Sequence, residues 1–142
     1  MKVCLYNGLV IAILTRNEHC PPHVHVGPRE WDARFEFSFW HNGVRLWDVE
    51  PVQNRPTDRL LEAIRQEIKK PEHLRRAREL WWKSRQTLCL DNKHWVIDDE
   101  RLASPQERRP DTRLILAGRF DAESYRTLLT LEGETAPLEI QL

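Results

Sequence analysis

The sequence predicts an α+β fold: an antiparallel four-stranded meander followed by two helices, with a small C-terminal α/β extension. Two patterns lead to this prediction. Apolar residues alternate at period two before residue 50, and they recur at helical spacing between residues 57 and 88. The chain has 142 residues, of which 40% are hydrophobic and 31% charged, so it is long enough to bury a real core. We expect two parts, residues 1–93 and an extension at 94–142 packed on them.

The first half of the chain predicts four consecutive strands. Residues 9–16 form the first, and residues 23–26 alternate polar and apolar until the turn signal at Gly27. Residues 33–39 place three phenylalanines on one face, which is typical of a half-buried antiparallel strand. Asn42-Gly43 tolerates the positive φ of a tight hairpin turn, so residues 44–49 are expected to return as the fourth strand.

Two helices follow after Pro56. Thr57 is a good N-cap for the first helix, which Pro71 ends. Pro71 also suits the first position of a second helix, where its missing N–H costs nothing. The apolar stripes that define the two helices comprise Leu60, Leu61, Ile64 and Ile68 in the first, and Leu74, Ala77, Trp81 and Leu88 in the second.

The pattern is weaker after Asp91. Residues 94–97 and 113–120 predict strands, and residues 137–142 predict an edge strand. Asp121 is expected to cap a short helix that runs to Leu129. Residues 104–111 contain two prolines and charges of both signs, which is typical of a linker.

The net charge of zero hides an uneven distribution. Residues 55–93 carry eleven basic and six acidic side chains, whereas residues 94–142 carry six basic and ten acidic ones. Local fields steer partners, so the middle segment is the candidate surface for a polyanion. The alternative is a solvated helix face, because Glu79 and Lys83 form a helical i to i+4 pair. The candidate nucleic-acid-binding residues are Arg75, Arg76, Lys83 and Arg85 for phosphate, and Trp82 for base stacking.

The length of the apolar runs and the spacing of the cysteines indicate the cellular compartment of the protein. The longest apolar run, residues 9–14, is far shorter than the ~20 residues that span a bilayer, so we expect no membrane contact. The three cysteines are odd in number and widely spaced, with no Cys-x-x-Cys pair. This spacing favours a reducing compartment and no disulfide framework, and we therefore expect a cytoplasmic protein.

The segment with most chemical potential is Glu-His-Cys-Pro-Pro-His-Val-His-Val at residues 18–26. Residues i and i+2 of a strand point to the same face, so His23 and His25 present two imidazoles side by side. With an ordinary pKa of about 6.5, one imidazole can accept the proton of a ribose 2′-hydroxyl while the other donates to the leaving oxygen. We expect His23 and His25 to be catalytic, with His19 in support.

Two alternatives compete with this acid–base pair. In one, the histidines are structural, and the basic helix binds a protein or a nucleic acid. In the other, His23 and His25 hold zinc together with His19 or Cys20, as in a metal-dependent hydrolase. The sequence has no His-Glu-x-x-His motif and no cysteine pair, so we rank this alternative third and expect no metal and no cofactor.

The stretch Pro-Pro-His-Val-His-Val at residues 21–26, preceded by Glu18 and His19, resembles the small bacterial domain of unknown function 4160. The resemblance covers roughly residues 6–90 and includes a tryptophan near the end of the second helix, at Trp81 or Trp82. It implies the toxin-like component of a prokaryotic type II toxin–antitoxin module, with a small antitoxin-like protein as partner. Together with the histidine pair, it predicts action on RNA or on translation, in the manner of a metal-independent ribonuclease.

Overall fold

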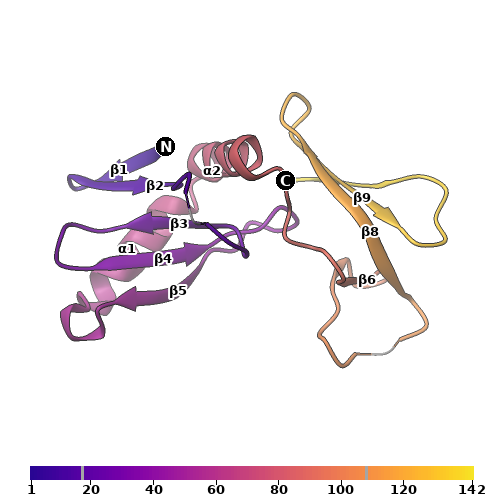
Figure 1. The fold of residues 1–142 in the computed structure, drawn as a ribbon, viewed down its shortest axis with the longest axis horizontal. Coiled ribbons are helices and arrows are strands. Elements are labelled where there is room, and N and C mark those ends of the chain that lie inside the picture. The colour runs from indigo at the N-terminus through magenta and orange to yellow at the C-terminus, as the bar shows by residue number, and fades with distance from the viewer. Residues whose placement is uncertain (17, 108) are drawn as a thin grey trace. The chain divides into compact units, whose positions relative to one another are not determined.

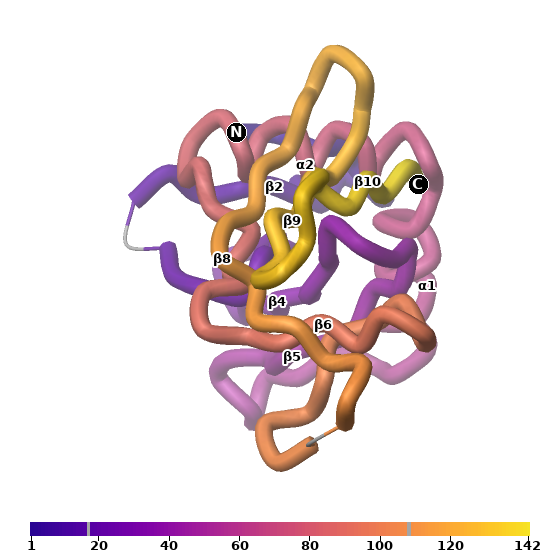
Figure 2. The backbone as a smooth tube through the Cα atoms, turned by 90° about the vertical axis from the view of Figure 1, so that its right-hand side faces the viewer, coloured from indigo at the N-terminus to yellow at the C-terminus, as the bar shows by residue number. Residues whose placement is uncertain are grey.

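The computed structural model describes residues 1–16, 18–107 and 109–142 (Figure 2). The chain divides into two compact units, Met1–Gln86 and Thr87–Leu142. The described residues form two α-helices and two sheets of antiparallel strands, so the α+β class is confirmed.

The first unit contains a five-stranded meander in which each strand pairs with its neighbour in sequence (Figure 1). The prediction of four strands is wrong because it omitted the N-terminal strand, whose partner is reached through a two-residue turn at Asn7 and Gly8. These residues have φ values of 46° and 82°, as a tight hairpin requires. The strands are β1 (Lys2–Tyr6), β2 (Leu9–Ala12), β3 (His23–Val26), β4 (Asp32–Glu36) and β5 (Arg45–Glu50).

The connection between β4 and β5 is longer than the tight turn predicted at Asn42-Gly43. β4 ends at Glu36, and residues 37–44 form an irregular loop. Phe37 and Phe39 of this loop are buried. The buried guanidinium of Arg78 donates to the main-chain oxygens of Ser38 and His41, at 2.8 Å each. The loop is therefore fixed by core packing and by a helix side chain, which a local turn signal does not reveal.

Two helices, α1 (Asp58–Ile68) and α2 (Pro71–Arg85), cover one face of this sheet (Figure 1). A short 3-10 turn, η1 (Val52–Asn54), precedes them. The predicted N-cap is confirmed, since the Thr57 hydroxyl accepts from the Leu60 N–H at 3.2 Å. Pro71 opens α2 as predicted. Neither helix in the described part of the chain is long and apolar enough to cross a membrane.

The second unit is a five-stranded antiparallel sheet with the order β10-β9-β8-β6-β7. The helix predicted from Asp121 to Leu129 is wrong, because these residues belong to a β-hairpin. The Asp121 carboxylate accepts from the N–H groups of Glu123 and Ser124, so the expected helix cap instead stabilises the hairpin turn. The strands are β6 (His94–Val96), β7 (Arg101–Leu102), β8 (Thr112–Asp121), β9 (Arg126–Leu131) and β10 (Leu138–Gln141).

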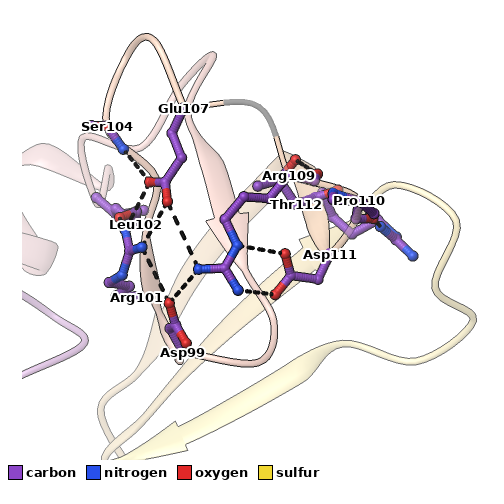
Figure 3. Close-up of polar contacts among 10 residues, drawn as sticks. Asp99, Arg101, Leu102, Ser104, Glu107, Arg109, Pro110, Asp111 and Thr112 are labelled. Atoms are coloured by element: carbon purple, nitrogen blue, oxygen red, sulfur yellow. Dashed lines mark hydrogen bonds and ion pairs between the residues drawn. The ribbon is translucent and has the colours of Figure 1, made fainter.

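Ion pairs hold the segment between β6 and β8, part of which was predicted as a linker (Figure 3). Arg101 pairs with Glu107 at 2.7 Å, and Arg109 pairs with Asp99 at 2.7 Å and with Asp111 at 3.0 Å. Hydrogen bonds from Arg101, and then from the Ser104 N–H, lower the pKa of Glu107 to about 2. This loop is stabilised by surface charge.

Candidate functional site

Two histidines of β3 converge on a carboxylate from the preceding loop. His25 Nε2 lies 3.0 Å from Glu18 Oε1, and His23 Nε2 contacts the other carboxylate oxygen, Oε2. The two imidazole rings have centroids 5.0 Å apart, as their i, i+2 placement predicts. One nitrogen or oxygen from each of the three side chains lies within 4.8 Å of the others. Glu18 therefore bridges the two imidazoles.

The remaining ring nitrogens are also engaged. His23 Nδ1 lies 2.7 Å from the main-chain oxygen of Pro21, and His25 Nδ1 lies 2.9 Å from Asp32 Oδ2. A main-chain oxygen only accepts, so His23 Nδ1 carries the proton of that bond, and the Asp32 carboxylate is the matching acceptor for a proton on His25 Nδ1. Both rings are thereby fixed with Nε2 toward Glu18.

Burial and charge move the two histidine pKa values in opposite directions. The side chains of Glu18, His23 and His25 are 6%, 1% and 16% exposed. Burial lowers the pKa of His23. Burial also lowers the pKa of His25, but the hydrogen bond and charge of Asp32, together with Glu18, outweigh it and raise this pKa above its ordinary value. His25 is therefore the imidazole that more readily holds a positive charge.

Aromatic rings and one arginine support the cluster. The His23 ring packs against Trp47 of β5 and Trp81 of α2, with centroid distances of 5.2 and 5.5 Å. Arg85, the last residue of α2, donates to the main-chain oxygen of Glu18. The helix therefore holds both the buried ring and the loop that carries the carboxylate.

Neither His19 nor Cys20, the residues predicted to support the histidine pair, joins the cluster of Glu18, His23 and His25 as a third ligand. His19 is exposed, and its ring lies edge-on to His23 and Trp47, with centroid distances of 6.4 and 6.2 Å. Cys20 is disulfide-bonded, so it offers no thiolate, and the expectation of a chain without disulfides is wrong at this residue. The sequence pattern alone assigns no role to Glu18, although this residue lies in the same segment.

The basic residues predicted on the second helix have different environments. Arg76 and Lys83 are exposed, whereas Arg75 pairs with Glu79 at 3.0 Å. Arg85 is committed to the Glu18 main chain, and Trp82 is half-buried. Phosphate binding and base stacking by these residues stay predictions, for which Arg76 and Lys83 have the most accessible charges.

The chain matches no protein-family model, no curated protein and no solved structure. The resemblance to the domain of unknown function 4160 therefore stays a prediction, and the functional argument depends on the residues themselves.

Proposed function

We propose that the protein is the toxin-like component of a two-component module and that its N-terminal unit acts by binding a small antitoxin-like protein. The observation that carries this proposal is an apolar strip on the β1–β2 hairpin, formed by Leu5, Val10 and Leu14. These three side chains are 51%, 47% and 42% exposed. Exposed apolar patches on a protein surface are typical of protein interfaces.

The register of the hairpin brings Leu5 and Val10 together, and Leu14 follows the end of β2. Leu5 pairs directly with Val10, so the two side chains share one face of the sheet. Val10 and Leu14 alternate with the buried Ile11 and Ile13, which places them on the face opposite the core. β1 is also the outer strand of the sheet. A partner can add a strand to this edge and cover the strip at the same time.

The geometry of the histidines favours the structural alternative over acid–base chemistry on RNA. A general base needs a ring nitrogen within hydrogen-bond reach of its substrate. His23 is 1% exposed, and both of its ring nitrogens contact protein groups. We therefore assign the N-terminal unit a binding role, and RNA is a second candidate partner supported by the exposed charges of Arg76 and Lys83. A cytoplasmic location stays a prediction.

Co-expression with the protein encoded by the neighbouring gene tests this proposal. We expect a complex in size-exclusion chromatography with light scattering, and we expect the Leu5→Lys/Val10→Lys double variant to weaken it about 10- to 100-fold, as for loss of interface anchors. Val52→Lys is the matched control, because Val52 is 75% exposed outside the strip. Failure to form a complex, or equal binding by the strip variant and the control, would overturn the proposal.

A further inference from the structure

We propose that Glu18, His23 and His25 bind a divalent transition-metal ion of the zinc type, with the Pro21 main-chain oxygen and the Asp32 carboxylate orienting the two imidazoles. Two imidazole nitrogens and one carboxylate oxygen form a donor set that suits zinc and its neighbours among the transition metals. The third ligand in this proposal is Glu18, whereas the sequence pattern suggested His19 or Cys20. This inference does not depend on the proposed antitoxin-like partner.

The spacing of the donor atoms fits such an ion. Zinc takes nitrogen and oxygen ligands at about 2.0–2.2 Å, so neighbouring ligand atoms in a tetrahedral or octahedral site lie roughly 3 to 3.5 Å apart. His25 Nε2 and Glu18 Oε1 are 3.0 Å apart, and the three convergent atoms lie within 4.8 Å of one another. Small side-chain movements are enough to bring all three donors to one ion.

The outer contacts are those expected around metal-bound histidines. A ligating histidine donates its other ring N–H to a main-chain oxygen or a carboxylate, which fixes the tautomer. His23 makes the first kind of bond, to Pro21, and His25 makes the second kind, to Asp32. Both imidazoles therefore present Nε2 as the donor atom, and both Nε2 atoms face Glu18.

The ion would bind between the two histidine Nε2 atoms and the Glu18 carboxylate. Metal ions take imidazole and carboxylate ligands in their proton-free forms, so binding releases any proton held between these atoms. Glu18 and Asp32 are the carboxylates in contact with the two imidazoles, and the neighbouring Arg34 pairs with Asp48.

One side of the cluster is closed and the other is accessible. Trp47 and Trp81 pack against His23, which is nearly fully buried. His25 is 16% exposed, and Asp32 beyond it is half-exposed. Water can complete the coordination from the His25 side, as in a site with three protein ligands.

Calorimetric titration of the full chain with zinc chloride near neutral pH tests the proposal. We expect one zinc ion per chain, with proton release that appears as a dependence of the heat on the buffer. Glu18→Gln should weaken binding at least about 100-fold through loss of a ligand, and Asp32→Asn should weaken it about 10- to 100-fold through loss of orientation. His94→Ala is the control, since this exposed histidine lies on β6 and its removal should leave the affinity unchanged.

The half-exposed Asp32 provides a variant whose fold is expected to survive, and a thermal melt of each variant checks this. Absence of zinc binding by the folded wild-type chain would overturn the proposal. So would an affinity that Asp32→Asn and Glu18→Gln leave unchanged, or one that only His94→Ala reduces.

Discussion

Met1–Gln86 buries ionisable side chains, whereas Thr87–Leu142 keeps its charged groups nearer the surface. Among the described residues, the buried side chains of the charged and histidine types are Glu18, His23 and Arg78, all in the first unit. In the second unit, Asp99, Arg101 and Arg109 form their ion pairs while each is more than a third exposed. The same residue types thus serve a buried site in one unit and a surface loop in the other.

The difference between the two units predicts different energetic costs. A buried charge is costly unless it is paired and hydrogen-bonded, so removal of one partner leaves a large penalty. An exposed ion pair contributes about 0–1 kcal/mol, because water and salt screen it. The Glu18–His23–His25 cluster is therefore a stronger candidate for function than the denser network in the second unit.

The largest effect should come from Arg78→Ala. Its guanidinium donates to the main-chain oxygens of Ser38 and His41 and to Asn42 Oδ1, so its loss leaves buried acceptors unpaired. We expect the free energy of unfolding to fall by about 3 kcal/mol or more. Urea unfolding, followed by the tryptophan fluorescence that comes mainly from the first unit, measures it. Arg76→Ala on the same helix should change it by less than about 0.5 kcal/mol, and equal losses would contradict the comparison.

Glu18 and Glu107 each accept several hydrogen bonds, but their removal should change the stability of the protein by different amounts. Glu18→Ala removes the acceptor of the buried His23 and the partly exposed His25 and should cost about 1–3 kcal/mol, whereas Glu107→Ala should cost less, because water and salt screen its ion pairs. Thermal unfolding near neutral pH, with a chelator present, gives both values. A larger loss for Glu107→Ala would show that surface pairing stabilises this chain more than the buried cluster does.

The salt dependence of RNA affinity distinguishes exposed charges that contact phosphates from charges that are already paired within the protein. If Arg76 and Lys83 contact phosphates, each change to Gln should reduce the slope of log affinity against log salt by about 0.7 for a single strand. Arg101→Gln removes one charge from a residue already paired with Glu107 and should leave the slope unchanged. Fluorescence anisotropy with a labelled poly(U) oligonucleotide measures the slopes. Equal slopes for all three variants would remove RNA as a candidate partner of α2.

The smallest expected effect is the loss of stability at acid pH. Glu107 has a pKa lowered to about 2 by Arg101, so its contribution to stability is present above the unfolded value of 4.5 and is lost as pH falls through 2. A side-chain NMR titration should find its midpoint near 2, and Arg101→Gln should raise that midpoint. A wild-type midpoint at the unfolded value would mean that the surface pair is absent in solution.

Local patterns predicted much of the fold because capping, periodicity and burial agree there. Thr57 and Pro71 begin their helices as expected. Prediction failed where a distant contact decides the structure, as at residues 37–44, which Arg78 holds from α2. It also failed at Asp121, because the same side-chain hydrogen bonds serve a helix cap and a hairpin turn.

The candidate site was predicted in part. The i, i+2 spacing of His23 and His25 follows from strand geometry alone. The role of Glu18 depends on how the loop before β3 folds back, and Asp32 reaches His25 only because β3 pairs with β4. Neither contact can be predicted from the spacing of residues in the sequence.

Diffraction from zinc-soaked crystals of the full chain, recorded on both sides of the zinc absorption edge, tests the central claim most directly. The account predicts one anomalous difference peak about 2.0–2.2 Å from Glu18, His23 and His25, with Asp32 still bonded to His25 Nδ1. A peak held by other residues, or no peak in crystals where these three side chains are ordered, would contradict it.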